Sequence, residues 1–256
     1  MARKIFFFIE PDDLQREDDG RVVAFILRND EHHHVFRVLR SKVGDELWGT
    51  DGKGAMFHAG ITAMNSSEIH AAVIEAYPDF GEESFRLTLA QAVPKQQRFE
   101  WLLEKGTEIG IDSFWPLRTK FSEVHPGAGK RKRWERIVKT ATKQCGRSRC
   151  PELLPDVSFE DIMQESHDFT HKWIAHGPEK LQGGIPAADV ARDGGSSQTG
   201  IVLIGPEGGF SGPELEMAVA NGFSQLMLGT RRLRSETAGL AAALLVLERM
   251  RAPAGA

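Results

Sequence analysis

From residue 85 onward the sequence alternates between short apolar runs and longer amphipathic segments, and this alternation restricts the fold more than any other feature. Strand-like runs lie at 85–93, 111–119, 171–177, 201–205 and 224–229. Helical spacing of apolar residues predicts helices at 95–110, 132–145, 213–221 and 235–250, and the Gly- and Ser-rich stretch 183–200 predicts a linker. Because strands that alternate with helices form a mostly parallel sheet covered by helices, we expect an α/β fold.

The first third of the chain is β-rich instead. Short apolar or alternating runs occur at 4–10, 21–26, 45–54, 55–64 and 68–77. The turn residues TDGKG at 50–54 predict a hairpin between two of these strands. The Pro- and Gly-containing stretch 78–84 then separates two patterns, so we expect a small β-domain at 1–77 and a larger α/β domain at 78–256.

The composition narrows the class of protein. The chain of 256 residues has a formal net charge of −4, so any nucleic-acid signal must be local. It contains no apolar run near the ~20 residues that span a bilayer, and its N-terminus lacks the apolar region of a signal peptide. The spacing of Cys145 and Cys150 indicates two reduced thiols. We therefore expect a cytoplasmic protein that does not bind membranes.

A glycine-rich loop, IGPEGGF at 204–210, follows a buried strand. Ligands of open α/β sheets bind at the carboxyl ends of strands, and glycines let a ligand approach the backbone. Ser211 and Glu214 have the spacing of a capping box that begins the next helix. The loop fits neither the dinucleotide fingerprint nor the P-loop pattern. It therefore predicts a backbone-lined site, with a plain tight turn as the alternative.

A second strand, glycine-started loop and helix follow at 226–245. We expect Ser235 to be the N-cap of the helix. We also expect the carboxylate of Glu236 to interact favourably with the positive end of the helix dipole. The two loops are expected to be neighbours in the sheet and to wall one pocket. This second loop contains three arginines, Arg231, Arg232 and Arg234. A solvated turn does not need that many cations.

These segments in order resemble the RsmE family of the SPOUT superfamily, which methylates N3 of uridine 1498 in 16S ribosomal RNA. The similar stretches are IGPEGGFSGPE and LGTRRLRSETA at the C-terminus, HVFRVLRSKVGDEL at 34–47, AQAVPKQQRFEWLLEKGTEIGI at 90–111 and QCGRSRCPEL at 144–153. Lys143 and Arg232 depart from the family pattern, and we assign them no role by analogy.

The resemblance implies a trefoil-knotted methyltransferase domain behind a PUA-like β-barrel, a homodimer, and S-adenosylmethionine as cofactor. A backbone-lined, glycine-rich slot suits the mostly apolar methionine and adenine groups. The expected cofactor-binding residues are Leu203, Ile204, Gly205, Pro206, Glu207, Gly208, Gly209, Leu228, Gly229, Leu233, Arg234, Thr237 and Ala238.

The local basic signal lies at 129–150, where nine cations accompany one acid, Glu135. In a chain of net negative charge, such a stretch indicates phosphate contacts more than plain solvation. The expected RNA-binding residues are Arg37, Arg40, Lys95, Arg133, Gln144 and Arg147. We predict no metal site, because His32, His33 and His34 on a strand would point alternately to opposite faces.

Uridine N3 carries a proton and becomes a good nucleophile only when that proton leaves. Arg234 is the first candidate to stabilise the uracil anion. Glu207 is a candidate base, or equally a structural acceptor within its own loop. Two other functions stay open: a SPOUT ribose 2′-O-methyltransferase, and a non-catalytic RNA-binding protein with a decayed site.

Overall fold

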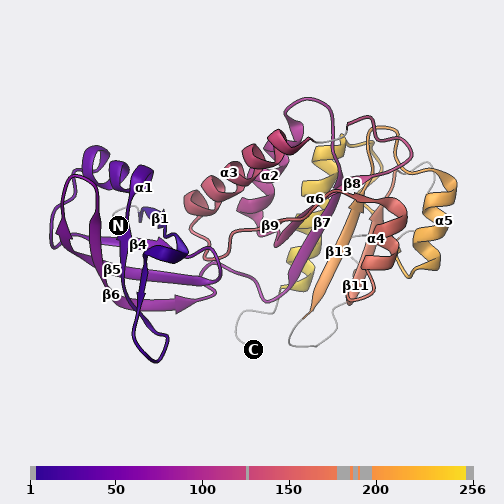
Figure 1. The fold of residues 1–256 in the computed structure, drawn as a ribbon. Helices are drawn as coiled ribbons and strands as arrows, with labels where there is room; N and C mark the ends of the chain where they lie inside the picture. The colour runs from indigo at the N-terminus through magenta and orange to yellow at the C-terminus, as the bar shows by residue number, and fades with distance from the viewer. Residues whose placement is uncertain (1–3, 125–126, 178–184, 187–189, 191–197, 252–256) are drawn as a thin grey trace. The chain divides into compact units, whose positions relative to one another are not determined.

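The structure is a computed structural model that describes residues 4–124, 127–177, 185–186, 190 and 198–251 (Figure 1). It divides into two compact units. The first contains Met1–Glu82 and Thr140–Cys150, and the second contains Glu83–Lys139 and Pro151–Ala256. The β-rich start and the α/β remainder confirm the expected fold class.

The first unit is built on one six-stranded sheet with the order β1-β4-β5-β6-β3-β2. Its strands are β1 (Phe6–Phe8), β2 (Leu14–Arg16), β3 (Val22–Leu27), β4 (Glu46–Thr50), β5 (Ala55–Met64) and β6 (Ile69–Pro78). The predicted hairpin is confirmed, since β4 and β5 are antiparallel and Thr50 pairs with Met56. Buried side chains such as Phe7, Phe25 and Phe57 form the core of this unit.

The segment 140–150 belongs to the first unit, although the sequence pattern placed it in the second domain. The amide of Gly54 and the hydroxyl of Thr50 both donate to the carbonyl of Ser148, and the amide of Cys150 donates to Gly52. These hydrogen bonds tie the segment to the β4–β5 hairpin, which no local pattern could reveal.

The histidine run is not a strand. It spans α1 (Asn29–His33) and the following π-type helix His34–Val38, and a 3-10 helix occupies Pro11–Asp13. His32 is buried, and its ring lies 3.0 Å from the carbonyl oxygen of Asn65. The strand geometry used to exclude a metal site was therefore wrong at these residues.

The second unit contains an eight-stranded sheet in which every strand pairing is parallel. Its order is β10-β8-β7-β13-β11-β14-β12, with β9 pairing to β8. The strands are β7 (Arg86–Ala92), β8 (Ser113–Arg118), β9 (Glu152–Leu153), β10 (Val157–Ser158), β11 (His171–Ala175), β12 (Ile185–Pro186), β13 (Thr199–Ile204) and β14 (Ser224–Met227). The short strands β9, β10 and β12 were not predicted, and most of the predicted linker 183–200 lies outside the described residues.

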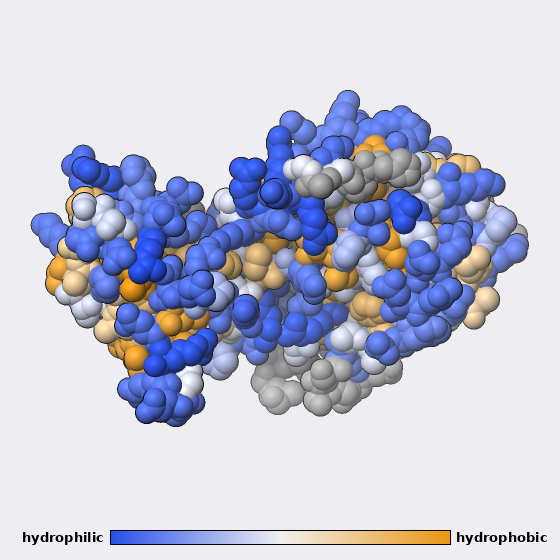
Figure 2. All heavy atoms as spheres, viewed as in Figure 1, coloured by the Kyte–Doolittle hydropathy of each residue, from blue (hydrophilic) through white to orange (hydrophobic). Residues whose placement is uncertain are grey.

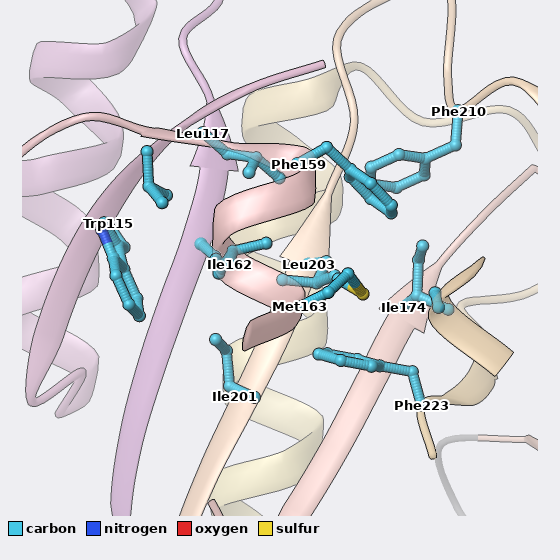
Figure 3. Close-up of a cluster of buried hydrophobic side chains, with 13 residues drawn as sticks. Trp115, Leu117, Phe159, Ile162, Met163, Ile174, Ile201, Leu203, Phe210 and Phe223 are labelled. Carbon is cyan, nitrogen blue, oxygen red and sulfur yellow. The ribbon is translucent and has the colours of Figure 1, made fainter. Parts of the chain in front are cut away.

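Helices cover both faces of this sheet. They are α2 (Arg98–Ile109), α3 (Ala128–Cys145), α4 (Phe159–Glu165), α5 (Gly212–Ala220) and α6 (Ser235–Met250). Helices α2 and α6 pack together over β7 and β13, whereas α4 and α5 lie over the opposite face (Figure 1). Figure 3 shows the core on the α4 side, where Phe159 and Ile162 pack against Ile201 and Leu203 of β13. The N-terminal end of α6 lies near the carboxyl ends of β11, β13 and β14, and the candidate site forms there.

Candidate functional site

A cavity of about 400 Å³ opens at the carboxyl ends of three strands of the second unit. Its walls come from the ends of β11, β13 and β14 and from the loops that follow them. The lining residues are Ala175, His176, Gly177, Ile204, Gly205, Pro206, Glu207, Gly208, Gly209, Leu228, Gly229, Arg231, Arg232, Leu233, Arg234, Ser235 and Ala238. Both predicted loops therefore wall one pocket, as expected.

The loop after β13 is fixed by its own glycines and capping box and by one long-range hydrogen bond. Gly209 has φ +69°, and a Cβ on Gly205 would lie 3.0 Å from the carbonyl carbon of Gly209. Ser211 and Glu214 form the predicted capping box of α5, with the Ser211 amide 2.7 Å from the Glu214 carboxylate. The other oxygen of Glu214 accepts a 2.7 Å hydrogen bond from the amide of Lys120. Gly205 and Gly209 therefore lie so close to each other that a side chain at Gly205 would collide with the loop backbone.

The loop after β14 is held differently from the prediction. Arg234, not Ser235, is the N-cap of α6, and it makes no side-chain cap hydrogen bond. The hydroxyl of Ser235 instead donates a 2.7 Å hydrogen bond to the carbonyl of Gly205. The side-chain amide of Gln91 donates to the same hydroxyl at 2.6 Å. Ser235 therefore joins the two loops and β7, which explains why it is not free to cap its helix.

The two loops are separated in the sheet by β11, which pairs with both β13 and β14. The expectation that their strands are adjacent was wrong, because strand order is set by long-range pairing. Ala175, His176 and Gly177 consequently form a third wall that the sequence analysis did not include. The sequence offered a signal for it, since the run HKWIAHG also ends at a strand's carboxyl end.

Arg98 of α2 adds a charge that sequence reasoning missed. Its guanidinium lies 3.5 Å from the carboxylate of Glu207 and 3.7 Å from that of Glu236. Glu236 is buried, and its second carboxylate oxygen has no hydrogen-bond partner among the described residues. Arg98 therefore places one cation between the two loops.

Two predicted cofactor residues do not reach the cavity. Leu203 has 0% exposure, and its side chain packs in the core on the α4 side (Figure 3). Thr237 is exposed on the first turn of α6 but is absent from the lining. The reason is alternation: neighbouring residues on a strand or helix turn point in different directions.

The predicted RNA-binding residues of the second unit are exposed, one on α3 and one in the loop between β7 and α2. Arg133 of α3 pairs with Glu100 at 2.8 Å, and Lys95 pairs with Glu123 at 2.5 Å. The hydrogen bond to the Glu123 carboxylate raises the pKa of Lys95. Figure 2 shows hydrophilic residues over α3, whose exposed cations include Lys132, Arg133 and Arg136.

The predicted residues of the first unit divide into two groups. Arg37, Arg40 and Gln144 are exposed, as phosphate contact requires. Arg147 is buried, with only 5% of its side chain exposed, and it pairs with the equally buried Glu82 at 2.7 Å. The Arg147 side chain is therefore not presented to solvent as the sequence analysis expected, and its charge is paired with Glu82 inside the first unit. Lys143, one departure from the family pattern, pairs with Glu31 at 2.5 Å.

Within the described ranges, no group of three or more His, Cys, Asp or Glu residues could hold a metal ion. None of the described helices has the length and apolar character needed to cross a bilayer.

Comparison with known families identifies two models. An RNA methyltransferase domain model matches residues 81–247, and an RNA methyltransferase PUA domain model matches residues 27–74. The order of these matches agrees with the order of the two units.

Individual relatives cover most of the chain. The Ribosomal RNA small subunit methyltransferase E of Bacillus subtilis is 29% identical over 241 residues, which is 91% of this chain and 92% of that protein. The protein of the same name from Mesomycoplasma hyopneumoniae is 33% identical and covers 66% of this chain and 73% of its own length. A crystal structure of the Neisseria gonorrhoeae enzyme bound to S-adenosyl methionine has a TM-score of 0.79 at 25% identity, covering 97% of this chain and 98% of that chain.

Proposed function

The chain belongs to the RNA methyltransferase family whose domain model covers residues 81–247, and we propose that it methylates N3 of uridine 1498 in 16S ribosomal RNA. It is an S-adenosylmethionine-dependent ribosomal RNA methyltransferase with an N-terminal PUA domain and the knotted fold of its relatives. The observation that carries the proposal is the cavity that residues of both C-terminal family motifs, 204–214 and 228–238, line together.

The cavity fits S-adenosylmethionine in size and character. Its volume of about 400 Å³ falls in the usual range of ~300–1,000 Å³ for small-molecule sites. Gly209 lies so close to His176 that a Cβ there would come 3.1 Å from the ring, so this part of the cavity wall is formed by backbone. Gly205, Gly209, Leu228 and Leu233 would hold the cofactor, which supplies an electrophilic methyl group.

The protein's own residues must prepare the uracil. A base-paired N3 is inaccessible, so the base has to be unpaired or extruded. Arg234 is exposed, lines the cavity and sits at the start of α6. Its guanidinium is suited to stabilise negative charge on the uracil carbonyls when the N3 proton leaves.

Glu207 lines the same cavity, but its nearest charged neighbour is Arg98 at 3.5 Å. A carboxylate that already pairs with a guanidinium is better suited to hold the loop than to accept a proton. We therefore assign Glu207 to positioning and leave charge stabilisation to Arg234, and we propose that the N3 proton passes to water at the mouth of the cavity.

Phosphate contacts would orient the substrate rather than choose the base. We propose that Arg37 and Arg40 of the first unit bind backbone phosphates, together with Lys95, Arg133 and Gln144. The exposure of all five side chains supports this role. We propose two functional parts, residues 1–77 and 78–256, with the segment 140–150 of the second packed on the first.

We also propose a homodimer and a cytoplasmic location. Leu244 and Leu245 of α6 and Trp101 of α2 are large exposed apolar side chains, which favours a partner surface there. Small-subunit ribosomal RNA, the substrate in the relatives' names, supports the location.

The test uses purified protein, methyl-labelled S-adenosylmethionine and small ribosomal subunits that lack the modification, with naked 16S RNA in parallel. Product RNA is digested to nucleosides. We expect labelled 3-methyluridine from the wild type and at least a hundredfold lower kcat for Arg234→Ala, because a charge-stabilising donor is worth about that much. Label on a ribose would indicate the 2′-O-methyltransferase instead. Cofactor binding by calorimetry without transfer to any RNA would favour the non-catalytic alternative.

A further inference from the structure

A second cavity, of about 430 Å³, lies beside the cofactor loop in the same unit. It is lined by Lys120, Phe121, Ser122, Glu123 and Gly208. Gly208 lines both cavities, so the two share one wall. The second cavity is placed where a group reacting with the cofactor could enter.

The segment that carries Phe121 is held firmly. The amide of Thr119 donates to the hydroxyl of Ser122 at 2.9 Å, and the amide of Ser122 donates back to the carbonyl of Thr119 at 3.0 Å. The amide of Lys120 is bound by the buried carboxylate of Glu214, the capping-box residue of α5. The turn is therefore anchored to the helix that follows the cofactor loop.

Phe121 itself is displayed rather than buried, with 42% of the residue exposed. Its approach to the cofactor loop depends on glycine, since a Cβ on Gly208 would come 3.1 Å from the Cβ of Phe121. The ammonium of Lys120 lies 5.8 Å from the centre of the ring. An aromatic face with a neighbouring cation is the combination that binds an unstacked nucleotide.

We propose that Phe121 is the platform on which the extruded target uracil stacks before methyl transfer. The proposal rests on the function proposed above, because only an enzyme acting on a base needs that base unstacked. Phe121 would then position the base beside Gly208, and Lys120 would offset negative charge on the nucleotide. The occupant of the second cavity is a nucleobase of the RNA substrate.

The first test compares Phe121→Ala, Phe121→Leu and Phe121→Trp with the wild type. Because stacking on an aromatic side chain is worth roughly 5- to 150-fold in affinity per base, Phe121→Ala should lower kcat/KM for the ribosomal substrate by a factor in that range. Phe121→Leu should not recover the loss, whereas Phe121→Trp should return to within about threefold of the wild type. The Kd for S-adenosylmethionine should stay within about twofold in all three. Equal activity of the alanine or leucine variant, or a parallel loss of cofactor affinity, would overturn the proposal.

A second readout does not depend on methyl transfer. The fluorescence of Phe121→Trp is titrated with a short RNA containing unpaired uridine, and the wild type gives the background from its native tryptophans. Stacking should quench the added tryptophan more than the background. Quenching without formation of 3-methyluridine by the wild type would contradict the proposed reaction and support the stacking platform. Formation of 3-methyluridine without quenching would contradict the stacking platform and support the proposed reaction.

Discussion

The hydroxyl of Ser235 lies 2.7 Å from the carbonyl oxygen of Gly205 and donates a hydrogen bond to it. This bond joins the first turn of α6 to the loop after β13, across 30 residues of sequence. Gln91 of β7 adds a second bond to the same hydroxyl. One small buried side chain of α6 therefore joins the loop after β13 and strand β7 at the cofactor pocket.

Ser235→Ala is expected to loosen the pocket, because it leaves the carbonyl of Gly205 and the amide of Gln91 without this partner. A buried unsatisfied polar group costs about 1–3 kcal/mol, which corresponds to a fall in Tm of about 2–10 °C. S-adenosylmethionine should bind about tenfold more weakly, or about 1.4 kcal/mol. Thermal unfolding and calorimetry measure both, with Ser67→Ala, exposed in the first unit, as control. An unchanged Kd would show that the bridge does not shape the pocket.

Arg98→Gln tests the cation between Glu207 and Glu236. Without it the buried carboxylate of Glu236 loses its charged neighbour, so we expect a cofactor Kd about 3- to 10-fold higher, or about 1 kcal/mol. The matched control is Arg118→Gln, whose pair with Asp156 is half-exposed and should be worth about 0–1 kcal/mol to stability. If both variants bound cofactor equally well, Arg98 would have no positioning role.

The strongest sequence patterns predicted the structure closely. Helix α6 begins at Ser235 and ends at Met250, as its apolar spacing and flanking residues indicated. The capping box of Ser211 and Glu214 and the hairpin after Thr50 also formed as predicted. In each case the interactions that form the element lie within a few adjacent residues, so the local sequence predicts it.

The failures share the opposite property. The basic stretch around Arg147 predicted an RNA-binding cation. In the structure its guanidinium pairs with Glu82, which lies 65 residues earlier in the sequence. Likewise, β11 lies between β13 and β14 through pairings that no local pattern encodes. Ser235 has the residue type of an N-cap, but a buried carbonyl from another loop takes its hydroxyl. Long-range partners decide such positions, so periodicity and spacing do not predict them.

Gly239→Ala separates packing from helix propensity. Alanine in a helix interior is favoured over glycine by about 1 kcal/mol. At position 239, however, the new Cβ would lie 2.4 Å from the Gln91 side-chain oxygen and 3.0 Å from Leu102. We expect net destabilisation of about 1–3 kcal/mol in denaturant unfolding, because overpacking costs that much. Gly212→Ala in α5 meets nothing within 4 Å and should be neutral or stabilising by up to about 1 kcal/mol. A stable Gly239→Ala would mean that Gln91 can move away freely.

Arg147→Ala and Arg136→Ala remove the same charge with opposite expected effects. Removing one partner of a buried pair costs about 3–5 kcal/mol, so Arg147→Ala should lower the free energy of unfolding strongly. Arg136 is exposed on α3, and its loss should change stability by less than about 0.5 kcal/mol. It should instead weaken RNA binding and reduce the slope of log K against log salt by about 1.

The double variant Arg147→Met with Glu82→Leu should recover most of the lost stability, since it removes both buried charges. A stable single Arg147→Ala variant with weakened RNA binding would restore Arg147 to the RNA-binding set.

Leu244→Glu tests the proposed homodimer. Leu244 is 47% exposed on α6, and a carboxylate there would have to be desolvated if a second copy covers this face. Size-exclusion chromatography with light scattering should therefore find the variant monomeric at concentrations where the wild type is dimeric. Val219→Glu is the control, because Val219 is 50% exposed on α5 and lies on another helix. It should remain dimeric. A dimeric Leu244→Glu protein would place the interface elsewhere, and a monomeric wild type would contradict the homodimer itself.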